Sequence, residues 1–168
     1  MKIYTLETKT ILNNPIDDIF PFFANAENLD RVTPPWLKFE ILTPLPIEMK
    51  IGTIVDYRLQ LHGIPIRWRS KITEWNPPLK FTDVQIKGPY RFWKHEHLFI
   101  AEGNQTRMTD RVQYAIPGWI FAPLIHLLLV QPDLEKIFRY RERKFLEIFK
   151  GDGPVRSGGM NMIVPHSA

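Results

Sequence analysis

The sequence predicts one α+β domain in which a curved, seven-stranded antiparallel sheet wraps around a long C-terminal helix. The chain has 168 residues, the usual length of one domain. Between residues 36 and 115, apolar and polar residues repeatedly alternate, as in strands with one buried face. Between residues 119 and 150, apolar residues recur at helical spacing. Antiparallel strands must bury their apolar face, and this helix can cover it.

The first elements are a strand and two short helices. Residues 2–12 have the alternation of a strand, and Asn14-Pro15 then suits the start of a helix. Pro21 lacks an amide donor, so this first helix should stay short or kink. A second short helix is expected over residues 26–32, before Pro34-Pro35.

Six further strands and the long helix follow. The strands are expected over residues 36–43, 52–62, 65–75, 79–87, 91–101 and 105–115. The helix is expected over residues 119–150, with a break or kink at Pro132. The domain should therefore span residues 1–150, followed by a flexible, glycine-rich tail over residues 151–168.

Composition narrows the classes of protein. The absence of cysteine excludes disulfides, thiol nucleophiles and cysteine-ligated zinc. The N-terminus does not have the pattern of a signal peptide. The apolar run over residues 115–130 is short for a membrane span and is interrupted by Pro117 and Pro123. We therefore expect a soluble, cytoplasmic protein.

Two histidines in the strand 91–101 are the most distinctive polar feature. His95 and His97 are two residues apart, which places them on one face of a strand. Lys94 and Glu96 lie on the other face and favour water. The histidines should therefore point inward, beside Trp93 and Phe99.

The next turn predicts the partners of these histidines. If Gly103-Asn104 form a two-residue hairpin loop, directly opposed residues have numbers that add up to 207. The inward pairs are then His97 with Asp110, His95 with Val112, Trp93 with Tyr114, and Phe99 with Met108. Asp83 is left open: a three-residue loop at Gly88-Pro89 places it on the histidine face, whereas a two-residue loop places Val84 and Ile86 there.

The curled sheet should enclose a cavity with aromatic walls and a polar patch, which is the usual composition of a small-molecule pocket. The candidate ligand-binding residues are Tyr57, Trp68, Asp83, Trp93, His95, His97, Met108, Asp110 and Tyr114.

Five segments also carry a resemblance to a known superfamily. They are NLDRVTPPW (28–36), the strand at Gly52, ITEWNPPLKFTDVQ (72–85), GPYRFWKHEHLF (88–99) and TRMTDRVQY (106–114). Over about residues 3–149 the chain resembles the START-like (SRPBCC) helix-grip proteins, which include birch-pollen-allergen-like proteins, polyketide cyclases and coenzyme Q-binding proteins. It looks most like a bacterial subgroup described as ligand-binding or cyclase/dehydrase-like.

This resemblance implies a helix-grip domain that binds a hydrophobic or aromatic small molecule, lipid-like or polyketide-like. The first alternative is a cyclase or dehydratase, a lyase or isomerase in which His97 is the base, Asp110 orients it, and Asp83 or His95 is the acid. The second is a lipid or quinone carrier that docks through residues 119–130. For this segment, core packing and a subunit contact are the preferred interpretation, with lipid contact as the alternative.

The sequence does not favour a metal or a nucleic acid as partner. Two histidines and a carboxylate can ligate a metal, but the motif is short, and we expect neither metal nor cofactor. Arg67, Arg69 and Lys71 alternate onto the face opposite Trp68, which is typical of a solvated strand. Nucleic-acid binding would place basic residues among the aromatic ones, so no nucleic-acid partner is expected.

Overall fold

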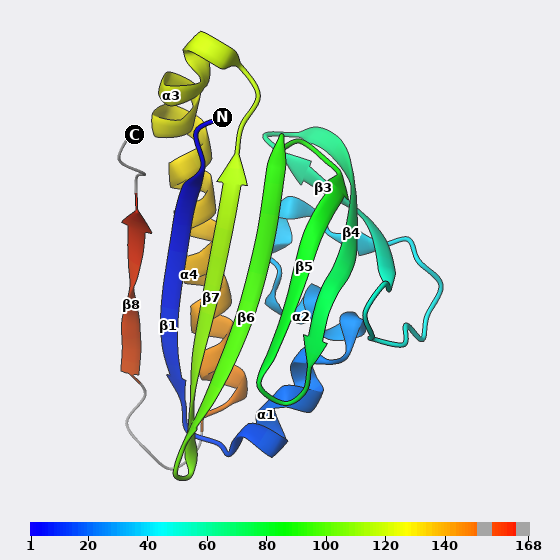
Figure 1. Cartoon of the computed structure of the whole chain (residues 1–168), viewed down its shortest axis with the longest axis vertical. Helices are drawn as coiled ribbons and strands as arrows, with labels where there is room; N and C mark the ends of the chain where they lie inside the picture. The colour runs from blue at the N-terminus through cyan, green and yellow to red at the C-terminus, as the bar shows by residue number, and fades with distance from the viewer. Residues whose placement is uncertain (151–155, 164–168) are drawn as a thin grey trace.

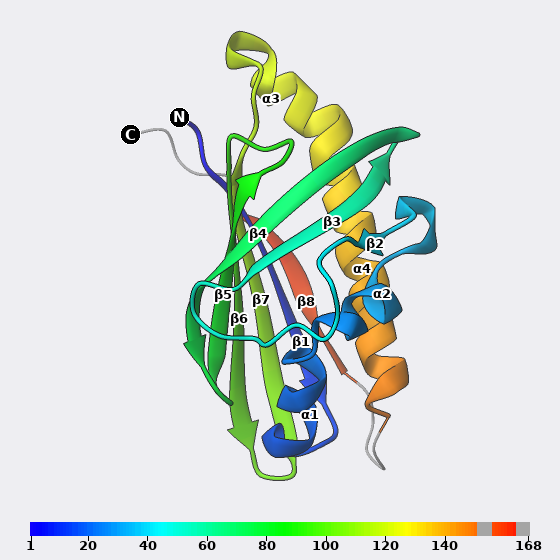
Figure 2. The same ribbon diagram turned by 90° about the vertical axis from the view of Figure 1, so that its right-hand side faces the viewer.

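The computed structural model describes residues 1–150 and 156–163, which form one antiparallel sheet and its helical cover (Figure 1). The sheet has eight strands in the order β2-β3-β4-β5-β6-β7-β1-β8. The strands are β1 (Tyr4–Leu12), β2 (Glu40–Ile41), β3 (Ile54–Leu61), β4 (Ile64–Asn76), β5 (Lys80–Lys87), β6 (Phe92–Glu102), β7 (Gln105–Ala115) and β8 (Arg156–Ile163). Figure 2 shows the sheet curving around the long helix α4 (Gln131–Ile148), so the predicted α+β architecture is confirmed.

Short helices close one end of the sheet, as expected. They are α1 (Ile16–Phe23), the 3₁₀ turn η1 (Ala26–Asn28), α2 (Leu29–Val32) and the 3₁₀ turn η2 (Pro35–Leu37). Pro15, rather than Asn14, occupies the N-cap position of α1. Asp17 and Asp18 stabilise its first turn, where carboxylates favour the positive end of the helix dipole.

The C-terminal helical region continues through Pro132, so the helix does not break there, and its irregularity is a π-helical segment directly before this proline. The 3₁₀ turn η3 (Trp119–Phe121) leads into α3 (Ala122–Ile125), the π-helical segment η4 (His126–Val130) and then α4. Pro132 lies in the first turn of α4. The wider π turn directly before it accommodates a ring that would clash inside a regular α-helix.

Two tight hairpins set the register of the sheet. His62 and Gly63 connect β3 to β4 with φ values of 50° and 81°, as a two-residue primed turn requires. Gly103-Asn104 connect β6 to β7, and the predicted register is confirmed: His97 pairs with Asp110. The His62 Nε2 atom also lies 2.6 Å from Asp133 Oδ2, which ties the first hairpin to the start of α4.

The eighth strand comes from the segment expected to be a flexible tail. Residues 156–163 pair antiparallel with β1, so for them this expectation is corrected. Gly158 lies so close to β1 that a Cβ atom would be 2.5 Å from the Lys9 carbonyl oxygen, and Gly159 has a φ of 91°. Glycines therefore permit the bulge in this pairing. Because glycine has a low strand propensity, they also make this strand difficult to predict from the sequence. The remaining tail residues, 151–155 and 164–168, lie outside the described residues.

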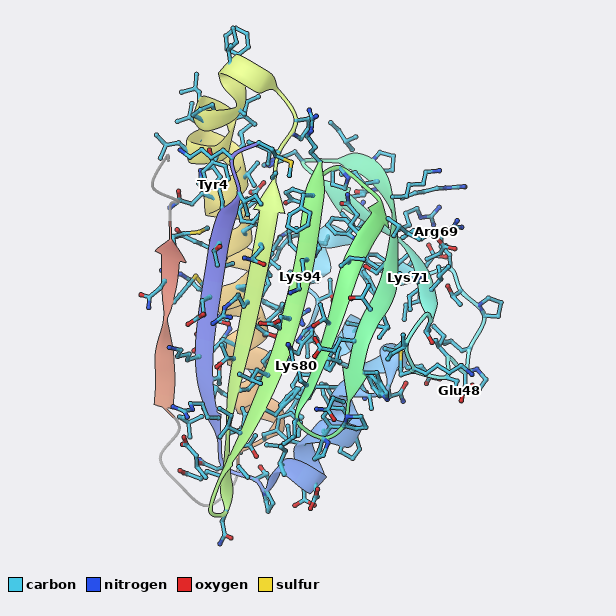
Figure 3. All side chains as sticks on the ribbon, viewed as in Figure 1. Tyr4, Glu48, Arg69, Lys71, Lys80 and Lys94 are labelled. Carbon is cyan, nitrogen blue, oxygen red and sulfur yellow. The ribbon has the colours of Figure 1, made fainter. Side chains whose placement is uncertain are left out.

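The inner face of the sheet carries two apolar clusters, one toward each end of α4. One cluster contains Trp68, Trp93, Tyr114 and Phe138, and the other contains Phe20, Phe81, Phe99, Met108 and Phe145. The outer face carries charges: Figure 3 shows Lys80 and Lys94 on the face of the sheet away from α4, where both lie near Glu96. His95 and His97 lie on the inner face and are buried, as expected from the charges of Lys94 and Glu96 on the outer face.

Candidate functional site

A cavity of about 200 Å³ lies between the inner face of β3–β6 and the helices α2 and α4. Most of its wall is apolar. The sheet contributes Tyr57, Leu59, Trp68, Phe81 and Trp93, and the helices contribute Leu29, Val32, Leu134, Ile137 and Phe138. For comparison, an apolar cavity of about 150 Å³ can hold benzene. This space therefore suits a one-ring or two-ring molecule.

The aromatic wall is built from residues on β3, β4 and β6 and on the β5–β6 loop. Tyr57 and Trp68 are paired across β3 and β4, and their rings stack with centroids 5.9 Å apart. Trp93 meets Trp68 edge to face at 5.1 Å. Tyr90 lies in the β5–β6 loop, where the Gln85 side chain donates to its carbonyl at 2.7 Å and accepts from its amide at 3.3 Å. This wall is thus fixed by cross-strand pairs and a braced loop.

Four ionisable side chains meet at one side of the cavity. Asp83 lies opposite His95 across β5 and β6, so the structure resolves the open loop parity in favour of the histidine face. On one side of the two imidazoles, Asp110 Oδ1 lies 2.6 Å from His97 Nδ1 and 3.3 Å from His95 Nε2. On the other side, Asp83 Oδ2 is 3.8 Å from both His95 Nδ1 and His97 Nε2. The two imidazoles are therefore held between two carboxylates.

The contacts with Asp110 are short but poorly aligned. Asp110 Oδ1, His97 Nδ1 and His95 Nε2 are buried, and none of them has a hydrogen bond of normal geometry among the described residues. Proximity without alignment makes the interaction mainly electrostatic. Burial strengthens it, because the interior screens charge less than water does.

Charges within this cluster shift the pKa values of the two histidines in opposite directions. Burial opposes the charge on His97, but Asp110 and Asp83 outweigh it and raise the pKa of His97. Burial and the neighbouring His97 lower the pKa of His95. Burial opposes ionisation of Asp110 too, but both histidines hold its pKa well below the usual range. These pKa shifts favour the proton on His97 over His95 and keep both carboxylates ionised.

A short polar chain connects this cluster to the aromatic wall. The Ser70 hydroxyl donates to Asp83 Oδ1 at 3.1 Å and accepts from the Trp68 indole at 3.1 Å. The Tyr57 hydroxyl lies 3.4 Å from the Ser70 hydroxyl oxygen. Ser70 therefore fixes one Asp83 oxygen, while Asp83 Oδ2 faces the imidazoles.

The same cluster has donors that could hold a metal. Asp83, His95 and His97 each offer one ligand atom, and these atoms lie within 4.8 Å of one another. Such a set suits divalent first-row metals. Ligation requires a neutral imidazole, whereas the two carboxylates favour the proton on His97. A proton therefore competes with a metal ion for the His97 imidazole.

Six of the nine predicted site residues line the cavity. They are Tyr57, Trp68, Asp83, Trp93, His95 and His97. Asp110 lies behind the histidines, buried at 4% exposure, and it contacts them without being part of the cavity wall. Met108 packs beside Phe99 in the second apolar cluster. Tyr114 is fully buried and contacts His126. Met108 and Tyr114 share the inward face of β7 but lie outside the cavity wall. Tyr114 belongs to the apolar cluster of Leu134, near the start of α4, and Met108 to the cluster of Phe145, near its end.

Several lining residues were not predicted. Ser70 and Tyr90 line the wall, and Arg141 of α4 extends into the space from the helix side. The sequence does hold a signal for Arg141: it continues the helical stripe of Leu134, Phe138 and Phe145, where a charge is unusual.

Residues 120–129 are largely exposed rather than packed in the core. Their exposed apolar side chains are Ile120, Phe121, Leu124, Leu127, Leu128 and Leu129. The segment is anchored by His126, whose ring stacks on Tyr4 at 3.6 Å and whose Nε2 lies 2.8 Å from the Tyr114 hydroxyl. Core packing is therefore wrong for most of this segment, whereas the subunit contact expected with it stays a prediction. Among the described residues, no helix is long and apolar enough to cross a membrane.

Comparisons with known proteins identify the fold. No protein-family model matches the sequence, and no curated protein matches it either. Among solved structures, the chain is similar to the Zhui aromatase/cyclase from Streptomyces sp. R1128, with a TM-score of 0.70 and 16% identity over 88% of this chain and 94% of that one.

The chain is also similar to two plant proteins, over nearly the same share of its length. A point mutant of norcoclaurine synthase from Thalictrum flavum, in complex with a transition-state analogue, has a TM-score of 0.63 and 15% identity over 87% of this chain and 96% of that one. Major latex-like protein 151 from Panax ginseng has a TM-score of 0.59 and 15% identity over 87% and 99%. At these identities the likeness shows the fold, and the helix-grip architecture expected from the sequence is confirmed.

Proposed function

We propose that this protein binds a small hydrophobic or aromatic molecule in the cavity between its sheet and α4. The observation that carries this proposal is the composition of the cavity wall. Stacked aromatic residues surround about 200 Å³ of space, and polar groups gather on one side of it around His97 and Asp83. Apolar walls supply affinity, and a few polar groups fix the orientation of a ligand. A carbonyl or hydroxyl oxygen of the ligand would face His97, whose pKa is raised by the two carboxylates beside it.

A fluorescent neutral probe, N-phenyl-1-naphthylamine, tests this proposal. Its emission rises in an apolar site, and we expect saturable binding of one probe per chain. Ile137→Trp fills the cavity from α4 and should abolish this binding. Leu127→Trp enlarges an exposed side chain by a similar amount and should leave it unchanged. Equal binding by both variants would place the probe elsewhere and refute the proposal.

A second candidate is an enzyme that moves a proton on a bound ketone, as a cyclase or dehydratase does. The observation that favours it is the short approach of Asp110 to His97, together with the raised pKa of His97. The sequence predicted His97 as the base and Asp83 or His95 as the acid, and the raised pKa of His97 favours the reverse assignment. The His97 imidazolium would donate to a carbonyl oxygen, and a neutral His95 or the Asp83 carboxylate would accept a proton from the adjacent carbon. The aromatase/cyclase and synthase named above show that the fold accommodates catalysis.

A third candidate is a lipid or quinone carrier that docks on a membrane surface. The exposed apolar side chains of residues 120–129 favour it, since a patch of this kind marks interaction sites. Flotation with phosphatidylcholine vesicles tests this candidate. A carrier would float, and a triple variant in which Phe121, Leu127 and Leu128 become Gln would not, while both would still bind the neutral probe. Failure of the unmodified protein to float would reject this candidate.

A further inference from the structure

Arg141 is a cation on the cavity side of α4. Its Nε atom is buried and has no hydrogen-bond partner among the described residues. Its guanidinium lies over the rings of Phe138 and Phe145, at 5.8 and 5.6 Å from their centroids. Among the described residues, its guanidinium also makes no ion pair. The charge is therefore surrounded by aromatic rings and cavity space.

Three other arginines of the chain have carboxylate partners. Arg58, Arg69 and Arg111 each lie beside a carboxylate on the outer surface. Arg141 instead continues the apolar stripe of its helix and lines the cavity. Cation–π contact with Phe138 and Phe145 offsets part of the cost of this partly buried charge. It leaves the buried Nε atom without a hydrogen-bond partner among the described residues.

The opposite wall holds groups that respond to this charge. Tyr57 lies across the cavity on β3, and the charge of Arg141 acts to lower the pKa of its hydroxyl against the larger effects of burial and Asp83. Arg141 and the Asp83 carboxylate are farther apart than an ion pair. A ligand between them therefore meets a cation on the helix side and carboxylates on the sheet side.

We propose that the cavity takes an amphipathic ligand whose carboxylate pairs with the guanidinium of Arg141. The planar guanidinium donates two parallel hydrogen bonds to a carboxylate, which matches its shape and charge. The aromatic body of the ligand then fills the space beside Phe138 and Trp68. Asp83 and Asp110 repel the carboxylate from the sheet side, so the ligand has one orientation. This inference rests on the proposed binding function and adds the ligand's charge and direction.

A pair of ligands of matched shape tests the inference. Naphthalene-1-acetic acid and naphthalene-1-acetamide share a two-ring body and differ in the negative charge. Both compete with N-phenyl-1-naphthylamine, so their dissociation constants follow from loss of its fluorescence. We expect the acid to bind at least about tenfold more tightly than the amide, the change that one charged hydrogen bond provides.

Variants at Arg141 assign this preference to the guanidinium. Arg141→Gln should bring the acid-to-amide ratio to about one, mainly because the acid binds more weakly. Arg141→Lys keeps the charge but loses the planar fork, so it should retain part of the preference. Arg143→Gln, which removes an exposed cation from the same helix, should keep the full preference.

The unliganded protein provides a second measurement that is independent of binding. Arg141→Met removes an unpaired, partly buried charge and retains an apolar stem, so it should unfold at a higher urea concentration than the unmodified protein. A lower midpoint would show that Arg141 has a structural partner and would overturn the inference.

The binding outcomes also separate the two proposals. Equal affinities for acid and amide in the unmodified protein, or a preference that survives in Arg141→Gln, would overturn the role of Arg141 and leave the binding function standing. Failure of the neutral probe to bind would overturn the binding function itself.

Discussion

His97 Nδ1 lies 2.6 Å from Asp110 Oδ1, at a position where the two residues face each other directly across β6 and β7. Both side chains are buried. This pair keeps the far nitrogen of His97, Nε2, on the side of Asp83 and the cavity. The buried carboxylate thereby sets both the charge and the orientation of the imidazole that a ligand would meet.

Replacing Asp110 with Asn should strongly destabilise the fold. The amide keeps the shape but removes the charge that compensates His97. Breaking a buried ion pair in this way costs about 3–5 kcal/mol. Urea denaturation at pH 7 measures the loss. Asp56→Asn is the matched control: it removes a carboxylate from a surface pair with Arg69, and it should cost less than about 1 kcal/mol.

The stabilisation by Asp110 should disappear in acid. Its pKa is lower in the folded protein than in the unfolded chain, whose carboxyl titrates near 3.8. The folded state therefore binds fewer protons in this range, and the contribution is present above the unfolded pKa and is lost as the pH falls below it. The difference in unfolding free energy between the unmodified protein and Asp110→Asn should narrow from pH 5 to pH 3. A constant difference would mean that packing, and not charge, causes the loss.

His97→Gln should distinguish binding from proton transfer. Glutamine retains a hydrogen-bond donor, so affinity for the neutral probe should fall by less than about tenfold. Deuterium exchange at the α-carbon of 2-tetralone, followed by NMR in heavy water, measures proton transfer on a ketone of suitable size. For a binding protein, the exchange should equal that in buffer. A catalysed exchange that falls by about 10²–10⁴-fold in His97→Gln would instead support the enzyme.

Tyr114→Phe should loosen the exposed helical segment. It removes the hydroxyl that lies 2.8 Å from His126 Nε2 and leaves this buried nitrogen without its partner, which costs about 1–3 kcal/mol. Hydrogen exchange of the amides of residues 122–130 should accelerate. Tyr140→Phe on α4 is the control and should not affect these amides. Unchanged exchange in Tyr114→Phe would show that stacking on Tyr4 alone holds His126.

Gly88→Ala should disturb the loop that holds Tyr90. A Cβ atom there would lie 2.3 Å from Gln85 Oε1, and two hydrogen bonds to Tyr90 prevent that side chain from moving freely. We expect a loss of about 1–3 kcal/mol in unfolding free energy. In a Gln85→Ala background the same substitution should have little further effect. Additive losses in the double variant would show that the clash is not with Gln85.

Much of the sheet followed from the sequence because its turns are specific. The loop of Gly103-Asn104 fixed the partner of every inward residue of β6, including Asp110 for His97. Strand alternation likewise placed Tyr57 and Trp68 inside. These features are local: they depend on period two and on turn length.

The parts that escaped prediction depend on distant contacts. Alternation places Met108 and Tyr114 inward, but only the course of α4 decides that they pack under its ends. β8 has little strand propensity and forms because its glycines allow a close approach to β1. Exposure of Leu127 and Leu128 depends on how far the helical region extends beyond the sheet. A pattern along the chain does not contain these distances.

NMR mapping of the neutral probe tests the central claim most directly. The indole N–H signals of Trp68 and Trp93 report on the cavity wall, and Trp75, which does not line the cavity, is an internal reference. Saturating N-phenyl-1-naphthylamine should shift the first two signals and leave Trp75 unchanged. If Trp68 and Trp93 do not shift while the methyl signals of Leu127 and Leu128 do, the ligand binds the exposed apolar segment, and the cavity is not the binding site.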